Sequence, residues 1–322
     1  MTATHSLLCV GAPRRFLAVI LALCVCTGLL AGCGASVAAE SGLRVGFVGV
    51  GSTEGNSTAV MEKKAVAGLR AAGMTVTYRP SATADPMRQI NAADALLEQD
   101  PSVLVVNMRY INLWTDTLLK FKAAGIPVVL LGSKPIGLKA TMYDAYLGPS
   151  AHDIGTQLGT WVRHAAATAQ QKLRVLTVTT PLDSVTSSDI DFGRDQAMAP
   201  DASHIADTTI VGSWNSDATR ASVARRLDAS GTSATKLPQV MIGYSAAATD
   251  AILTELAKRG IPTSSTVTKG AVCVLGVHGG SGDMALSVMW DADYSKQLAR
   301  IVQKLGNGQA IVKDNLVALQ VK

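Results

Sequence analysis

Cysteine and aromatic side chains are scarce in this chain of 322 residues, and their scarcity limits what can hold it together. Of five cysteines, Cys9, Cys24 and Cys26 lie in an apolar leader, which leaves Cys33 at its end and Cys273 far downstream. A framework of several disulfides is therefore excluded, and the fold must depend on an ordinary hydrophobic core. Aromatic residues make up only 4% of the chain while Ala, Gly, Val, Ser and Thr dominate, which favours closely packed α/β layers.

Clusters of basic residues are missing as well. The leader holds two of the 29 basic residues and none of the 24 acidic ones, so the rest of the chain keeps a small, dispersed positive excess. Surfaces that bind nucleic acid are strongly and locally basic, so no nucleic-acid partner is expected. His152, His164 and His204 have no spacing that would gather them around a metal, and a metal site is not expected either.

Residues 1–32 have the three-part form of an export signal. Arg14 and Arg15 supply positive charge, an uncharged apolar run follows over residues 16–30, and small residues then precede Cys33. The run is shorter than the roughly 20 residues that span a bilayer as a helix. We therefore expect a cleaved leader and a working protein outside the cytoplasm.

The end of the leader, Leu-Ala-Gly-Cys at residues 30–33, resembles the lipobox of bacterial lipoproteins. The resemblance implies that Cys33 is lipidated and that residues 33–42 form a short tether. The protein would then be anchored to a membrane of the cell envelope, facing the periplasm or the extracellular side. An ordinary secretory signal cleaved after Ala39, which would discard Cys33, is the alternative and stays open here.

Downstream of the tether, apolar strand patterns alternate with helix patterns. The strands are uniformly apolar, as they are in parallel sheets covered by helices on both faces. Two successive series of this kind predict an α/β fold of two doubly wound parallel-sheet lobes. Strands are expected at 43–50, 74–78, 103–106, 126–131, 173–178, 208–211, 239–242 and 272–277, and helices at 58–72, 85–99, 115–124, 152–169, 189–198, 218–229, 246–259 and 294–305.

Short runs within this pattern match one family in their order and spacing. They are Val-Gly-Phe at 45–47 with Gly-Ser-Thr-Glu-Gly at 51–55, Ala-Gly-Ile-Pro-Val-Val at 124–129, Val-Leu-Gly-Val-His-Gly at 274–279, and Asn-Leu-Val at 315–317. The chain resembles the type I periplasmic binding proteins of sugar ABC transporters, the group that binds ribose, galactose and galactofuranose. The resemblance implies a three-segment hinge between the lobes and a small ligand, a carbohydrate or related polar solute, held between them. It also implies an ABC permease and its ATPase as partners.

The same resemblance implies where the lobes and the ligand contacts lie. Lobe one would comprise residues 43–147 and 279–292, and lobe two residues 148–278 and 293–322. The chain would pass between the lobes near 146–149, 278–282 and 290–293. The ligand-binding candidates at strand ends and at these passages are Ser52, Thr53, Glu54, Asn56, Arg109, Ser133, Arg194, Tyr244, His278 and Trp290.

Several candidate positions depart from the family's sugar-binding pattern, in which carboxylates and amides pair with hydroxyls. Gly-Ser at 132–133 replaces the family's Asp-Arg after the fourth strand, and Tyr244-Ser245 replaces its Asn-Asp pair in lobe two. His278 stands in place of the carboxylate of the return strand, and Trp290 in place of the Gln of the third passage. These losses predict a ligand other than a simple aldopyranose, held in part by aromatic contact. The alternatives are that both rings only fill vacated space and that His278 caps its strand or faces water.

The chain lacks the signatures of common catalytic sites. Ser52, Ser133 and Ser245 lie outside any G-x-S-x-G turn, and the glycine spacing after the first strand does not fit a dinucleotide loop. The sequence therefore predicts a cofactor-free solute-binding lipoprotein that serves an ABC importer, not an enzyme. A sensory subunit that signals to a membrane receptor or kinase is the alternative. A sugar-responsive repressor is disfavoured, because the chain has an export signal and no pattern of N-terminal DNA-binding helices.

Overall fold

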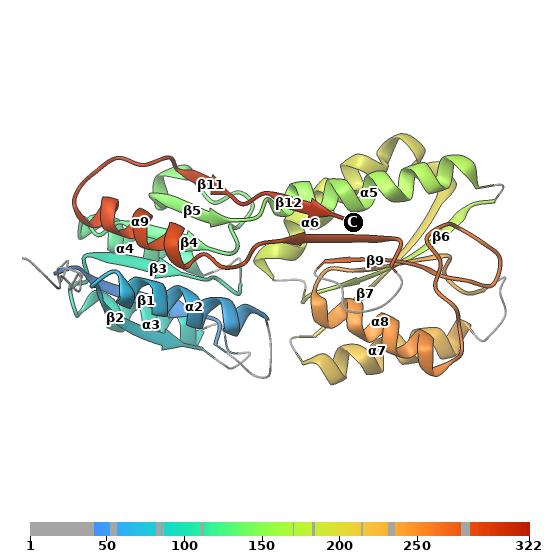
Figure 1. Ribbon diagram of the computed structural model, residues 1–322, viewed down its shortest axis with the longest axis horizontal. Helices are drawn as coiled ribbons and strands as arrows, with labels where there is room; N and C mark the ends of the chain where they lie inside the picture. Colours follow the sequence, from blue (N-terminus) through green and yellow to red (C-terminus); the bar gives the residue numbers. More distant parts are fainter. Residues whose placement is uncertain are drawn as a thin grey trace, which may run out of the picture. The chain divides into compact units, whose positions relative to one another are not determined.

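The computed structural model describes residues 42–51, 57–81, 85, 87–110, 113–169, 171–181, 184–213, 215–230, 236–277 and 284–322. These residues belong to one compact unit, residues 40–322, which is built on two sheets (Figure 1). The expected leader, most of the expected tether and Cys33 lie outside the described residues.

The first sheet has six strands, paired in parallel in the order β11-β5-β4-β3-β1-β2. Strands are added on both sides of β1, which is the arrangement of a doubly wound sheet. The strands are Arg44–Gly49 (β1), Thr75–Pro80 (β2), Val103–Val106 (β3), Val128–Leu131 (β4), Ala145–Gly148 (β5) and Asp314–Leu316 (β11). The helices that cover them are Ser57–Ala71 (α2), Met87–Leu97 (α3), Trp114–Ala123 (α4) and Ser295–Gly306 (α9).

Alternating side chains of the first sheet pack against helices on both faces. Val45 and Phe47 of β1 belong to the core under α2 and α9, while Val48 belongs to the core under α3 and α4. They separate because successive residues of a strand point to opposite faces. Gly68 lets α2 approach α9 closely, since a Cβ atom there would lie 2.6 Å from the Cβ of Ser295.

The second sheet also has six strands, in the order β12-β10-β9-β8-β6-β7, and only the β10–β12 pair is antiparallel. Helices α5 and α6 cover one face, and α7 and α8 cover the other (Figure 1). The strands are Leu173–Thr179 (β6), Ile205–Val211 (β7), Val240–Gly243 (β8), Cys273–Val277 (β9), Leu286–Trp290 (β10) and Leu319–Val321 (β12). The helices are Ala151–Thr168 (α5), Val185–Met198 (α6), Ser216–Ser230 (α7) and Ala246–Lys258 (α8), and short 3₁₀ turns span Ala140–Met142 and Ala199–His204.

Helices α5 and α6 touch backbone to backbone. A Cβ atom at Gly155 would lie 2.0 Å from the carbonyl oxygen of Ile190, and one at Gly193 would lie 2.0 Å from that of His152. Only glycine fits at such separations, so these two residues fix how closely the helices pack. The packing also fixes the position of Ile190, which the functional site uses.

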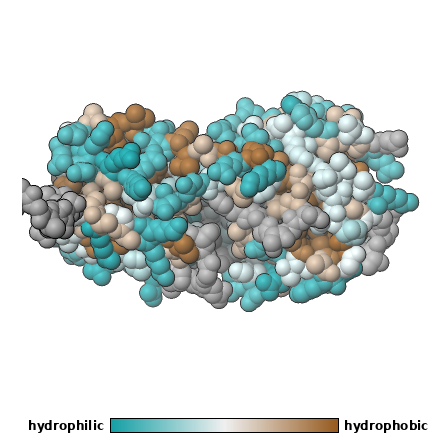
Figure 2. Space-filling model, in the orientation of Figure 1, coloured by the Kyte–Doolittle hydropathy of each residue, from teal (hydrophilic) through white to brown (hydrophobic). Residues whose placement is uncertain are grey.

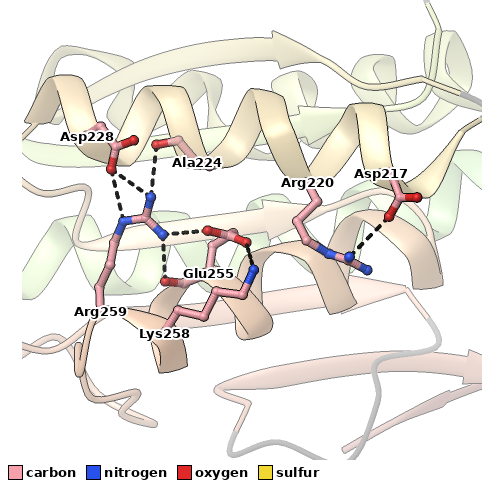
Figure 3. A network of polar contacts seen from close by, with 7 residues as sticks. All are labelled: Asp217, Arg220, Ala224, Asp228, Glu255, Lys258 and Arg259. Atoms are coloured by element: carbon pink, nitrogen blue, oxygen red, sulfur yellow. Dashed lines mark hydrogen bonds and ion pairs between the residues drawn. The ribbon is translucent and has the colours of Figure 1, made fainter.

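On the opposite face, ion pairs join α7 to α8 (Figure 3). Arg259 donates to the carboxylate of Asp228 at 2.6 Å and to the carbonyl of Ala224 at 3.3 Å, both on α7. It also donates to Glu255 of α8, whose other carboxylate oxygen accepts from Lys258 at 2.8 Å. Glu255 is almost fully buried, so its charge depends on these two cationic partners.

Three segments carry the chain between the two sheets. Two of them match the passages expected near 146–149 and 290–293, and the third does not match the one expected at 278–282. They lie between β5 and α5, between β10 and α9, and between β11 and β12. The passage expected at 278–282 lies outside the described residues, but the strands before and after it, β9 and β10, pair within the second sheet. The expected lobe boundaries are therefore wrong near the C-terminus: β10 belongs to the second sheet, and α9 and β11 to the first. The reason is side-chain packing, since Val288 of β10 lies in the core under α5 and α6, whereas Leu298 of α9 packs against α2.

The α/β fold with two doubly wound sheets is confirmed. On the face shown in the space-filling view, hydrophilic and neutral residues predominate and hydrophobic ones are scattered between them (Figure 2). No helix among the described segments is long and apolar enough to cross a membrane.

Candidate functional site

A cavity of about 450 Å³ lies where strands of both sheets end. Ligands of open α/β sheets bind at the carboxyl ends of the strands, and this volume suits a small molecule. Its lining comes from the ends of β3, β4, β8, β9 and β10 and from the first turns of α2, α5 and α6. The lining residues are Thr58, Val60, Met61, Lys64, Asn107, Gly132, Ser133, Lys134, Pro149, Ala151, Ile154, Thr186, Ile190, Tyr244, Val277, Trp290, Asp291, Ala292, Asp293 and Tyr294.

Three of the ten residues proposed from the sequence line this cavity: Ser133, Tyr244 and Trp290. Ser133 follows β4, and its hydroxyl donates to the carbonyl of Met108 at 3.1 Å. The preceding residue, Gly132, has a φ of +78°, a left-handed conformation that glycine adopts without strain. This turn brings the serine to the strand end.

The ring of Tyr244 lines the cavity, and its hydroxyl is hydrogen-bonded to another residue of the protein. The hydroxyl donates to the carboxylate of Asp191 at 2.6 Å, and the side chain is almost fully buried. Burial raises the pKa of Tyr244 well above its usual range, Arg194 opposes this rise, and Asp191 adds to it. The residue therefore offers an aromatic surface that stays neutral.

Trp290 ends β10 at one of the passages between the sheets. Its half-buried side chain packs against the cores of both sheets and also lines the cavity. The segment after it supplies Asp291 and Asp293, which are the carboxylates among the described lining residues. Asp293 pairs with Lys64 of α2 at 3.6 Å, so this end of the cavity carries both signs of charge.

Arg194 does not line the cavity. It is buried between α6 and the second sheet, where it joins the helix to the strands. Its guanidinium donates to the hydroxyl of Thr177 at 2.8 Å and to Asp195 at 2.7 Å, and it lies 3.2 Å from the carboxylate of Asp207. Burial raises the pKa of Asp207, and the attraction of Arg194 opposes this rise. With these partners Arg194 supports the turn that carries Asp191 and, through it, Tyr244.

Arg109 is also absent from the cavity lining. Its side chain is almost fully buried, and burial lowers the pKa of its guanidinium while Tyr110 and Glu62 oppose this. Its backbone makes two hydrogen bonds. The N–H of Arg109 donates to the side-chain oxygen of Gln89 at 3.0 Å, and its carbonyl accepts from the N–H of Val185 at 3.3 Å.

The other candidates, Ser52, Thr53, Glu54, Asn56 and His278, lie outside the described residues. Gly51 and Val277, which precede these segments, are described, and Val277 lines the cavity.

Asn107 was not among the candidates chosen from the sequence, although Arg109, two residues later, was. Asn107 is the first residue after β3, lines the cavity and is almost fully buried. Its amide nitrogen donates to Glu62 at 2.8 Å. A polar residue directly after a fully apolar strand was the available signal, because strand ends are where such sheets bind ligands.

Apolar side chains from the second sheet's side complete the lining. Ile154 of α5, Ile190 of α6 and Val277 of β9 lie beside the ring of Tyr244. The cavity thus has polar groups at the first sheet, charges near Trp290 and an apolar wall at the second sheet. Within the described ranges, no group of three or more His, Cys, Asp or Glu is placed to hold a metal ion.

A sequence profile of the periplasmic binding protein domain matches residues 45–307. The match extends over most of the chain, which therefore belongs to this family of binding proteins. The two sheets and the three passages between them have the architecture of its type I members.

One curated relative is the fructose import binding protein FruE of Bifidobacterium longum (strain NCC 2705), which is 31% identical over 141 residues. The alignment covers 41% of this chain and 42% of that protein, so it spans less than half of the relative's length.

Solved structures share the fold over nearly the whole described chain. A Mycobacterium smegmatis protein in complex with β-D-fucofuranose superposes with a TM-score of 0.75 at 15% identity, over 87% of this chain and 91% of that one. The periplasmic binding component of the arabinose ABC transporter from Shewanella sp. ANA-3, bound to α- and β-L-arabinofuranose, gives 0.71 at 15% identity, over 86% and 91%. At these identities the likeness establishes the fold.

Proposed function

We propose that this protein is an extracytoplasmic solute-binding lipoprotein that captures a sugar in the cavity and delivers it to an ABC importer. The observation that carries the proposal is the cavity itself, which lies at the strand ends of both sheets in a member of the periplasmic binding protein family. The fructose import protein among its relatives supports a sugar as the ligand.

The ligand we propose is a monosaccharide in the furanose ring form, not a simple aldopyranose. Ile154, Ile190 and Val277 present an apolar wall, and the carboxylates and amides that pair with pyranose hydroxyls in the family's pattern are replaced by Gly132, Tyr244 and Ser245 in this chain. The rings of Tyr244 and Trp290 supply the aromatic contact, and the furanose complexes of two proteins with this fold support the same choice. Loop residues Ser52, Thr53, Glu54 and Asn56, together with His278, remain part of the proposed site.

For the N-terminus we propose a cleaved signal over residues 1–32, a lipid on Cys33 and a tether over residues 33–42. The end of the leader supports this, since its apolar run stops at Leu-Ala-Gly-Cys. Such an anchor would hold the binding protein beside the membrane in which the permease lies.

Calorimetric titration tests the ligand class. The mature chain is titrated with methyl β-D-galactofuranoside, methyl β-D-fructofuranoside and methyl α-L-arabinofuranoside, whose five-membered rings are locked, and with methyl β-D-galactopyranoside, whose six-membered ring is locked. We expect binding of at least one of the first three and none of the locked pyranoside, with a thermal shift that reports about 2.7 kcal/mol of stabilisation at 100 times the Kd. Tight binding of the pyranoside alone would overturn the furanose proposal, and no binding of any sugar would overturn the sugar class.

A further inference from the structure

A carboxylate without contact to solvent lies directly behind the cavity wall. Glu62 of α2 is fully buried, although Met61 and Lys64 beside it line the cavity. A buried charge is costly unless it is hydrogen-bonded, and Glu62 has four donors. They are the backbone N–H of Val50 at 2.7 Å, the backbone N–H of Gly51 at 3.1 Å, the hydroxyl of Tyr78 at 2.7 Å and the amide of Asn107 at 2.8 Å.

The donors are divided between the two carboxylate oxygens. Oε1 accepts from Val50 and Asn107, and Oε2 accepts from Gly51 and Tyr78. Each oxygen thus faces one backbone N–H, which cannot turn away. A glutamine here would direct its NH₂ group at one of these two N–H groups, so the position favours a side chain in which both oxygens accept, as they do in a carboxylate.

This requirement determines how Asn107 is oriented. Its NH₂ group donates to Glu62, so its amide oxygen is turned the other way. A Cβ atom at Gly132, on the cavity lining, would lie 3.6 Å from that oxygen. A flipped amide would place the oxygen of Asn107 against the carboxylate, and two acceptors at hydrogen-bond distance repel each other.

We infer that Glu62 is a positioning residue that holds Asn107 with its amide oxygen toward the ligand. The inference rests on the proposed function and deepens it, because it states what the ligand must present: a hydroxyl that donates to Asn107. The same carboxylate binds the N–H groups of Val50 and Gly51, and it thereby fixes the backbone directly after β1.

Two substitutions separate positioning from plain stabilisation. Glu62→Met has a side chain of similar length without an oxygen, and it therefore removes the acceptor that orients Asn107. Tyr78→Phe removes one hydrogen bond to the same carboxylate, at the oxygen that Asn107 does not use, and therefore serves as the matched control. Both variants lose a buried hydrogen bond, but only the first frees the amide of Asn107.

The first measurement is ¹⁵N NMR of the ligand-free mature chain, with the Asn107 side-chain amide assigned from its loss in Asn107→Asp. We expect one of its two amide protons to exchange slowly in the wild type and in Tyr78→Phe, and this protection to disappear in Glu62→Met. Two rapidly exchanging amide protons in the wild type would overturn the inference, even if Glu62→Met fails to fold.

The second measurement is titration with whichever of the three methyl furanosides binds the wild type. We expect an affinity loss of about tenfold or more in Glu62→Met and less than about twofold in Tyr78→Phe. Equal losses in both variants would show that Glu62 acts through stability alone and would overturn the inference. If no sugar binds the wild type, the proposed ligand class fails, and the NMR experiment still decides whether Glu62 orients Asn107.

Discussion

The backbones of Tyr110 and Ser184 pair in an isolated antiparallel bridge. Tyr110 follows the end of β3 in the first sheet; we call this sheet and its covering helices the first part. Ser184 is the N-cap of α6, which covers the second sheet. The next residue, Val185, is almost fully buried in the core that includes Met108 and Trp114 of the first part. Contacts between the segment after β3 and the start of α6, as well as the chain passages, therefore hold the two sheets together.

Truncating Val185 is predicted to weaken both the fold and ligand binding. Val185→Ala removes apolar contacts that exist only while α6 lies against the first part, and should cost about 1–3 kcal/mol of unfolding free energy. The affinity for the sugar should fall as well, because Thr186 and Ile190 of the same helix line the cavity. Urea unfolding and calorimetric titration measure the two effects.

Val223→Ala is the control for that variant. Val223 is equally buried, on α7 in the core away from the cavity. The Val223→Ala substitution should lower the free energy of unfolding by a similar amount and leave the Kd for the sugar unchanged. A Val185 variant with full affinity would show that this contact has no part in holding the site closed.

Trp290→Ala is predicted to weaken sugar binding at least about fivefold, which corresponds to about 1 kcal/mol. The ring lines the cavity at the passage from β10 to α9, where a stacked ligand would be central to the site. Trp161→Ala provides the comparison, since Trp161 is half-buried against the second core and lies outside this cavity. Unchanged affinity in the Trp290 variant, measured by titration, would mean that the tryptophan only fills space.

Glu255 is predicted to stabilise the α7–α8 pair in a pH-dependent way. Its hydrogen bond from Lys258 is the largest cause that lowers the pKa of the carboxyl, and Arg259 adds to it. A carboxyl whose pKa is lower in the folded state stabilises the fold above its unfolded pKa of about 4.3 and loses this effect as the pH falls through the folded value.

Glu255→Gln should therefore be less stable than the wild type by about 1–2 kcal/mol at pH 7. The difference should shrink steadily below about pH 4.3, in urea unfolding followed from pH 7 to pH 3. Glu98→Gln, at an exposed position after α3, should differ little from the wild type throughout. A gap between Glu255→Gln and the wild type that grows on acidification would contradict the ion-pair account.

The order of elements could be predicted from sequence because each depends on a local pattern. The strand at 103–106 was predicted with its observed bounds, and Gly73, the residue directly after the helix predicted at 58–72, has the φ of +80° typical of a glycine that ends a helix. The sheet to which β10 belongs could not be predicted in this way, since it depends on which core Val288 reaches.

For the site residues too, local features could be predicted from the sequence and contacts made only in the fold could not. Ser133 was found because its place at a strand end is a local property. The role of Arg194 was not, because its partners Thr177 and Asp207 come from β6 and β7 and meet it only in the fold. Asn107 was missed because the same strand offered a more conspicuous charged residue, Arg109.

Cys33→Ser is predicted to release the protein from the membrane fraction or to block its processing. A lipobox serine cannot carry the thioether-linked lipid, so labelling with a radioactive fatty acid should mark the wild type alone. Label on the Cys33→Ser chain, or a wild-type mature N-terminus at Glu40, would contradict the anchor.

A crystal structure of the mature chain with bound methyl β-D-galactofuranoside, or with whichever sugar gives the largest thermal shift, tests the central claim most directly. The account predicts the sugar in the cavity at the strand ends, with a hydroxyl donating to the amide oxygen of Asn107 and its ring against Trp290 or Tyr244. A sugar bound elsewhere, such as the separate hollow beside Trp161 and Arg174, with this cavity empty, would contradict it.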